Sequence, residues 1–160
     1  MLPDPLHPAV VHLPLALAAV VPLCAAAALY AIRSGFLPAR AWVFATGLQV
    51  LLAGSAWIAV DTGGDQYDRV KRVVAEERIG EHADAAEWFA YAATATALIF
   101  AAGLARDRIG RPARITAVLA SLFVLATAVR TGYLGGQLVY HHGAARAYTE
   151  AGGPEAEAPR

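Results

Sequence analysis

Residues 6–32 read LHPAVVHLPLALAAVVPLCAAAALYAI and contain no Asp, Glu, Lys or Arg. A helix of about 20 apolar residues is long enough to cross the hydrocarbon core of a bilayer. Three further apolar runs follow, at residues 41–60, 85–105 and 114–140. In lipid the backbone must satisfy its own hydrogen bonds, and none of these runs alternates apolar and polar residues as a barrel strand does. Each run therefore predicts a transmembrane helix.

The composition agrees with lipid as the surrounding solvent. Of the 160 residues, 58% are hydrophobic and 16% are charged, whereas about 25% are charged in a typical soluble domain. A soluble chain of this size cannot bury so much apolar surface in one core. The sequence thus predicts an all-α, integral membrane, antiparallel four-helix bundle that forms one domain over residues 1–143. It argues against a soluble enzyme.

Charge and cysteine content exclude several partners and sites. Lys plus Arg number 13, as do Asp plus Glu, so the net charge is zero. The usual electrostatic argument for nucleic acid binding is therefore missing. The single cysteine, Cys24, excludes an internal disulfide, a thiolate zinc cage and a covalent c-type haem attachment. Membrane lipid is the expected partner.

The loops predict an orientation in the membrane. Residues 33–40 hold two arginines and no acidic residue, and residues 106–113 hold three arginines and one aspartate. The middle connection, residues 61–84, holds four basic and seven acidic residues. Short loops rich in Lys and Arg stay in the cytoplasm. We therefore expect a multi-pass protein of the inner (cytoplasmic) membrane, with both termini and the middle connection outside the cytoplasm.

Two segments outside the apolar runs carry weaker signals. In the middle connection, Tyr67, Val70, Val73 and Val74 recur at helical spacing among charges, which predicts a short amphipathic helix on the outer surface. Residues 144–160 are mostly Ala, Gly, Pro and Glu, a composition that predicts a disordered tail.

The histidines fall at one side of the predicted bundle. They are His7, His12, His82, His141 and His142. In the predicted topology all five lie at the outer membrane face, where the ends of the first, third and fourth helices can converge. Imidazole is the commonest metal ligand and an axial ligand of haem. The alternative is that these side chains cap helices or bind water at the interface.

His12 is the strongest candidate ligand among them. It lies inside an apolar run, about 7 Å deeper than His7 at helical rise. In lipid an imidazole must have its nitrogens satisfied, because each unpaired polar group costs several kcal/mol. We therefore expect a metal or haem iron to take one nitrogen of His12.

Arg130 and several glycines complete the candidate site. Arg130 lies about 15 Å inward of Tyr140, where a charge costs at least ~2.5 kcal/mol. We expect it to face the bundle interior and to pair with Glu87 or with a haem propionate.

The glycines have a packing interpretation and a functional one. Gly132 and Gly136, with Gly135 between them, have the spacing of a close helix contact, or they leave room for a flat macrocycle. We expect packing. Asp61-Thr62-Gly63-Gly64 is expected to end the second helix, with Thr62 or Asp61 as a hydrogen-bond partner of a histidine.

Two motifs resemble those of a bacterial four-helix membrane family, domain of unknown function 2231. Residues 6–14, LHPAVVHLP, resemble its L-H-P-x-x-V-H-F-P opening, with Leu13 where the family usually has Phe. Residues 135–143, GGQLVYHHG, resemble its G-G-x-L-V-Y-x-H-G close. By position His142, and not His141, matches the family's histidine, and members tend to have a histidine where His82 stands. The resemblance implies no settled activity. Some members are joined to, or encoded near, iron–sulfur or cytochrome partners, which implies a redox role.

The first functional hypothesis is membrane electron transfer. It places b-type haem at the outer face, with His7, His12, His82 and His142 as axial ligands and Arg130 nearby, and it implies a redox partner protein there. The second is a copper or zinc site on the same histidines, used in sensing, delivery or transport. The third is a structural or assembly subunit without a cofactor. An electron carrier or binding protein is expected rather than an enzyme.

Overall fold

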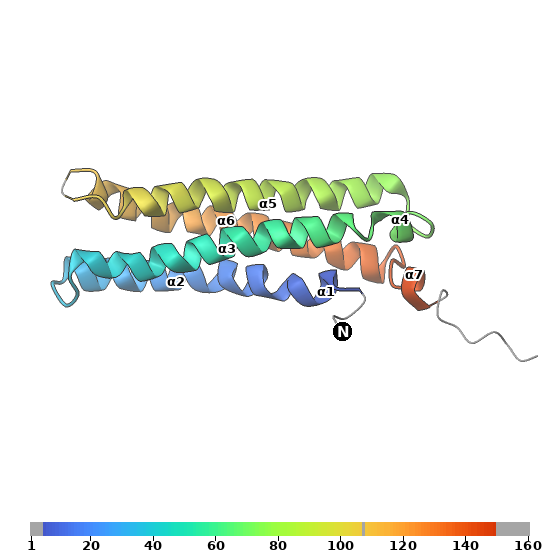
Figure 1. Cartoon of the computed structure of the whole chain (residues 1–160), viewed down its shortest axis with the longest axis horizontal. Coiled ribbons are helices and arrows are strands. Elements are labelled where there is room, and N and C mark those ends of the chain that lie inside the picture. The colour runs from blue at the N-terminus through green and yellow to red at the C-terminus, as the bar shows by residue number, and fades with distance from the viewer. Residues whose placement is uncertain (1–4, 107, 150–160) are drawn as a thin grey trace, which may run out of the picture.

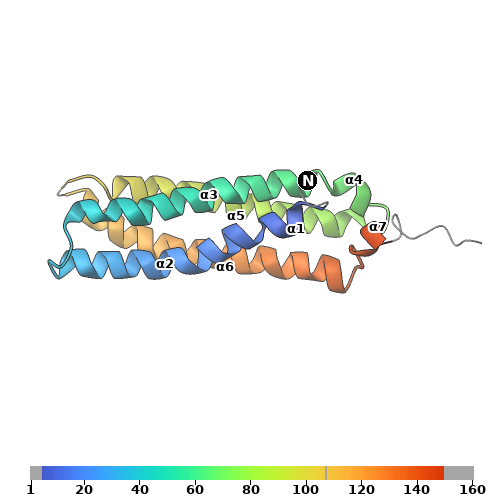
Figure 2. The ribbon, with the colours of Figure 1, turned by 60° about the horizontal axis from the view of Figure 1, so that its bottom comes forward.

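Four long helices run side by side in alternating directions in the computed structural model, which describes residues 5–106 and 108–149 (Figures 1 and 2). They are α2 (His12–Arg33), α3 (Trp42–Gly64), α5 (Glu76–Ala102) and α6 (Gly110–Tyr140). Short elements are α1 (His7–Val10), the 3-10 turn η1 (Ala39–Ala41), α4 (Tyr67–Val70) and α7 (Arg146–Thr149). The prediction of an all-α four-helix membrane bundle is confirmed, with four helices long and apolar enough to span a bilayer.

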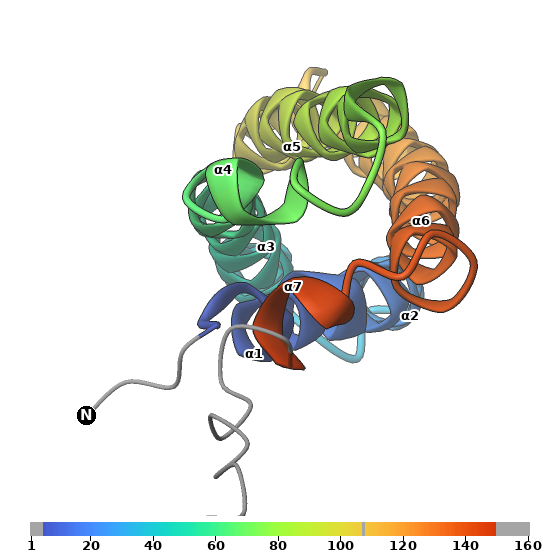
Figure 3. The same ribbon diagram turned by 90° about the vertical axis from the view of Figure 1, so that its right-hand side faces the viewer.

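The four long helices form a ring when the bundle is viewed along its axis (Figure 3). Helix α2 packs against α3 and α6, and helix α5 packs against the same two neighbours. Helices α2 and α5 are therefore diagonal to each other. Side chains that point inward from these two helices face each other across the interior.

Small side chains fill much of the interior, and large apolar side chains cover the outside. Buried alanines include Ala25, Ala90 and Ala117, while Leu23, Phe44 and Phe123 are exposed. A soluble bundle would bury its largest apolar groups, because water drives them inward. Helices in lipid instead associate through small residues that allow close approach. The distribution is that of a bundle surrounded by lipid.

The helices extend beyond the apolar runs that predict them. Helix α5 begins at Glu76 and α6 at Gly110, well before residues 85 and 114, and α3 continues to Gly64. The expectation that residues 61–64 end the second helix is confirmed, since α3 ends at Gly64. Hydropathy detects only the part of a helix that lies in hydrocarbon. The charged turns at the ends of these helices lie outside the hydrocarbon but form the same helical backbone hydrogen bonds.

A break at Val11 separates α1 from α2. Pro14 has no backbone N–H, so it cannot bond to the carbonyl of Val10, and the regular helical pattern is interrupted there. His7 and His12 stand on opposite sides of this break. Residues five positions apart on a helix point about 140° apart, so the two imidazoles face different surroundings.

The short helices α1, α4 and α7 lie at one end of the bundle (Figure 1), which we call the histidine end because all five histidines lie there. Val74, after α4, is buried against Leu138 and Ala144, and the Tyr148 hydroxyl donates to Gln66 Oε1 at 2.9 Å. The predicted surface helix is thus present as the single turn α4. The prediction of disorder is wrong for residues 144–149, since Ala144 and Ala147 are buried and α7 is helical. Residues 150–160 lie outside the described residues. The opposite end, with residues 33–42 and 103–114, is called the arginine end.

Candidate functional site

Two of the five histidines meet inside the histidine end. His7 comes from α1 and His82 from the first turns of α5, which is diagonal to α2 in the ring. Their ring centroids are 6.5 Å apart, and the ring planes are inclined by 78°. Both side chains are half-buried. The predicted convergence of histidines from different helices is therefore present for this pair.

His7 is held in one orientation by helix α3. Its Nδ1 lies 3.0 Å from the carbonyl oxygen of Ala59 and 3.3 Å from Oγ1 of Thr62. The Thr62 hydroxyl can donate to the carbonyls of Ile58 and Ala59, so Nδ1–H of His7 donates to Ala59. We assign the tautomer from these contacts. The lone pair is then on Nε2, the arrangement in which metal-ligating histidines are usually held.

His82 carries a buried nitrogen without a partner. Its Nδ1 has no hydrogen bond to any described residue. Burying an unsatisfied polar group costs about 1–3 kcal/mol, and such atoms in a native fold call for a specific explanation. A lone pair on this nitrogen would be satisfied by a metal atom or by a water molecule. The pair thus offers Nε2 of His7 and Nδ1 of His82.

Two glycines make room for the two rings. A Cβ atom at Gly63 would lie 3.1 Å from Cε1 of His7, and a Cβ atom at Gly135 would lie 3.1 Å from Cε1 of His82. Each imidazole therefore rests against a helix backbone, that of α3 or that of α6.

The expectation that Gly132 and Gly136 form the close helix contact is wrong: a Cβ at Gly136 meets nothing within 4 Å, and one at Gly132 meets only Leu15, at 4.0 Å.

We expect alanine at the two neighbouring glycines of α6 to act in opposite directions. Gly135→Ala forces the His82 ring to move, and overpacking of this kind costs about 1–3 kcal/mol. Gly136→Ala enters open space and gains up to about 1 kcal/mol of helix propensity. Thermal unfolding of the purified chain in detergent measures both changes. Equal effects of the two substitutions would show that His82 does not rest against Gly135.

The other histidines lie on the outside of the bundle. His12, His141 and His142 are exposed, so the side chain of His12 does not lie in the bundle interior, and its role as the strongest candidate ligand stays a prediction. Four histidines are expected as ligands: His7, His12, His82 and His142. Of these, only His7 and His82 lie in the interior of the bundle.

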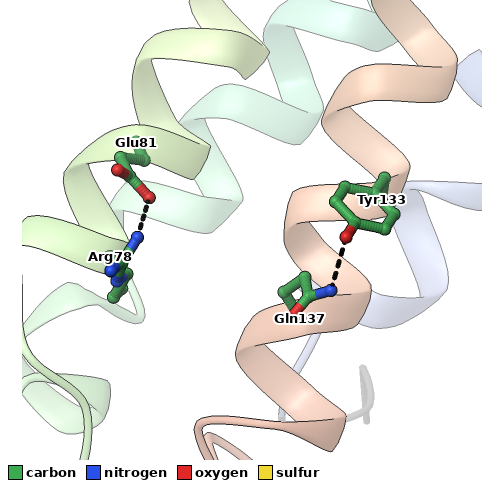
Figure 4. A network of polar contacts seen from close by, with 4 residues as sticks. All are labelled: Arg78, Glu81, Tyr133 and Gln137. Carbon is green, nitrogen blue, oxygen red and sulfur yellow. Dashed lines mark hydrogen bonds and ion pairs between the residues drawn. The ribbon is translucent and has the colours of Figure 1, made fainter.

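His142 borders a surface depression of about 240 Å³ between α5 and α6. Polar pairs on the two helices line this depression (Figure 4): Arg78 Nη1 lies 2.9 Å from Glu81 Oε2, and Gln137 Nε2 donates to the Tyr133 hydroxyl at 2.8 Å. Each of these pairs is joined within its own helix.

Arg130 lies exposed on the outer side of α6. The inward positions of this helix belong to Ala128 and to Thr131, whose hydroxyl lies 2.9 Å from the carbonyl oxygen of Ala85. The expectation that Arg130 faces the interior is wrong, and no ion pair joins it to Glu87 among the described residues. A long arginine side chain on the outside can extend its charge toward the membrane surface. The candidate site does not include it.

The described residues contain no group of three or more His, Cys, Asp or Glu side chains that could hold a metal ion. The described residues therefore supply two imidazole nitrogens and no third ligand of these types to the interior site. Zinc in structural sites takes four protein ligands, so a structural zinc site does not fit these residues.

Comparison with known proteins agrees with the two histidine-bearing motifs. No curated protein and no solved structure matches this chain. A family described as "Predicted membrane protein (DUF2231)" matches residues 3–147. The match includes His7 in the first motif and Gly135, against which His82 rests, in the second. The chain therefore belongs to the DUF2231 family of predicted membrane proteins.

Proposed function

We propose that a transition-metal atom binds between His7 and His82, and that the chain is a membrane electron-transfer protein in which this atom is the iron of b-type haem. The observation that carries the proposal is the buried Nδ1 of His82, which has no described partner and lies in a ring 6.5 Å from that of His7. Nε2 of His7 and Nδ1 of His82 would hold such an atom, since each is free of a hydrogen bond to the described residues in the assigned tautomer.

The number of ligands favours haem. A haem iron receives four nitrogens from its macrocycle and needs two axial ligands from the protein, commonly histidine. The interior site offers two imidazoles. The haem, when bound, supplies reversible one-electron chemistry at its iron, and burial in the bundle would tune its potential.

The chain's own residues would position and isolate such a centre. The carbonyl of Ala59 and the hydroxyl of Thr62 hold His7 with Nε2 as acceptor, while Gly63 and Gly135 allow both rings to lie deep between helices. The arginine-rich loops favour a cytoplasmic position for the arginine end. The His7–His82 pair would then lie at the outer face, where a redox partner protein could exchange electrons with it.

A copper ion on the same pair is the second candidate. Both Cε1 atoms lie against helix backbones, and a single ion needs less space between the two rings than a macrocycle does. Imidazole suits copper, and copper(I) accepts two ligands. In this case the protein would serve in copper sensing, delivery or transport.

The absorption spectrum of the purified full chain, recorded oxidised and then reduced with dithionite, tests the proposal. Haem with two axial imidazoles gives sharp visible bands on reduction, and metal analysis of the same sample gives iron in proportion to chain. Copper without these bands would replace the first candidate by the second. A chain with neither would overturn the proposed function and leave a cofactor-free structural subunit.

Labelling of single cysteines tests the proposed orientation. In a Cys24→Ala background, Gly64→Cys at the histidine end should react with a membrane-impermeant thiol reagent in intact cells, and Ser34→Cys at the arginine end should not. A Cβ at Gly64 meets nothing within 4 Å, and Ser34 is exposed, so both substitutions leave the fold intact. The reverse pattern would place the histidine end in the cytoplasm.

A further inference from the structure

The arginine end holds two adjoining cavities, of about 1050 Å³ and about 550 Å³. They lie where α2 and α5 end and where α3 and α6 begin, and they share the wall formed by Arg111, Pro112 and Arg114. These helix ends are also the ends of the four candidate membrane spans. The cavities are thus at the depth of lipid headgroups in one leaflet.

All the polar residues that line the two cavities, among those described, are arginines. They are Arg33, Arg40, Arg106, Arg108, Arg111 and Arg114. Among the described residues, no carboxylate lines either cavity. Helix α6 begins here, and its first turn adds the positive end of a long helix dipole. The described lining of the two cavities therefore carries six arginines and no acidic side chain.

Arg114 is fixed by packing and by a hydrogen bond, so the arginines at these cavities are more than a loose cluster of surface side chains. Its side chain is 6% exposed, and its Nε donates to the carbonyl oxygen of Gly103 at 2.8 Å. Gly103 packs directly against Trp42 Nε1, and a Cβ there would also lie 3.1 Å from Cγ of Arg114. Fixed in this way, Arg114 lines both cavities, and no hydrogen bond joins its two terminal nitrogens to another described residue.

Apolar side chains complete the lining. Val43 and Leu104 border the first cavity, and Leu29, Ile32 and Ile115 border the second. A ligand that fits both parts has an anionic group next to hydrocarbon. The planar fork of arginine matches phosphate oxygens, and basic pockets between transmembrane helices bind anionic headgroups. We propose that the two cavities bind the phosphodiester headgroup of an anionic membrane lipid, with its acyl chains along the apolar wall.

Native mass spectrometry of the full chain in detergent, titrated with phosphatidylglycerol or phosphatidylcholine, tests this site. Phosphatidylglycerol should bind at least about tenfold more tightly, because each arginine near an anionic headgroup contributes favourably. The double variant Arg108→Gln/Arg111→Gln should weaken phosphatidylglycerol binding by roughly tenfold or more. Both side chains are exposed, so the fold does not depend on them.

The control removes the same charge from the histidine end, in the double variant Arg72→Gln/Arg78→Gln. Phosphatidylglycerol binding should change less than about twofold there. Equal losses in the two double variants, or equal binding of both lipids by the unaltered chain, would overturn the proposal. Displacement of the lipid by millimolar inorganic phosphate would also overturn it, since the site would then select phosphate without hydrocarbon.

Discussion

His82→Ala is expected to remove the proposed metal centre from the purified protein while the chain still inserts and folds. His82 supplies the buried Nδ1 that has no described protein partner, so the substitution deletes one of the two ligands and no nearby group replaces it. Removing the group that hydrogen-bonds to a metal-ligating histidine already weakens metal binding by about 10–100-fold. Loss of the ligand itself should weaken it by more than about 100-fold. Absorption and metal content per chain measure the effect.

His12→Ala and His142→Ala are the matched controls, because both side chains are exposed on the outside of the bundle. They should retain the centre at the wild-type level, whereas His7→Ala should lose it as His82→Ala does. If His12→Ala loses the centre and His82→Ala retains it, the centre is not bound by the His7–His82 pair.

Trp42→Ala is expected to destabilise the bundle by about 3–5 kcal/mol, the usual cost of deleting a buried tryptophan. Trp42 is 0% exposed, its ring stacks on Phe100 with centroids 5.2 Å apart, and its Nε1–H donates to the Phe100 carbonyl at 3.0 Å. The substitution leaves a large cavity between α3 and α5 and removes one of the two donors to that carbonyl, the other being the Thr46 hydroxyl at 3.3 Å. Unfolding in mixed micelles, followed by a probe other than tryptophan fluorescence, measures the loss.

Trp88→Ala provides the comparison, since Trp88 is 72% exposed on the outside of α5. We expect a change within about 1 kcal/mol in detergent. If the two tryptophan variants unfold at the same denaturant concentration, Trp42 does not anchor the contact between α3 and α5.

The sequence predicts the number, order and direction of the helices because hydrocarbon imposes one simple requirement, an apolar run of sufficient length. It predicts their ends poorly for the same reason. Glu76 and Gly110 lie in helical turns that extend beyond the apolar runs, and hydropathy does not detect such turns. The tail residues Ala144 and Ala147 are small, and their burial depends on contacts that close the end of the bundle rather than on their own composition.

The site is predicted as a set of histidines at one end, but the pair that meets is not. Depth along a helix can be counted from the sequence, whereas rotation about the helix axis is decided by packing. His12 is deeper than His7, yet it points outward. The best available signal was glycine: Gly63 and Gly135 lie at the same end as the histidines, and each one accommodates an imidazole ring.

Arg130 illustrates the opposite error. The cost of a charge in hydrocarbon predicts an interior position and a partner, but the interior of α6 at that level is occupied by Thr131 and Ala128. A neighbouring position on a helix is rotated by about 100°. Arg130 therefore lies outside, where its length allows the charge to approach the membrane surface.

Electron paramagnetic resonance of the oxidised, purified chain tests the central claim most directly, because it detects the histidine nitrogens bound to ferric haem or to copper(II). We predict one centre with two imidazole nitrogens, with the signal lost in His82→Ala and unchanged in His12→Ala. A centre without imidazole nitrogens would contradict the account. So would the absence of a paramagnetic signal from an oxidised chain that contains its full complement of iron or copper.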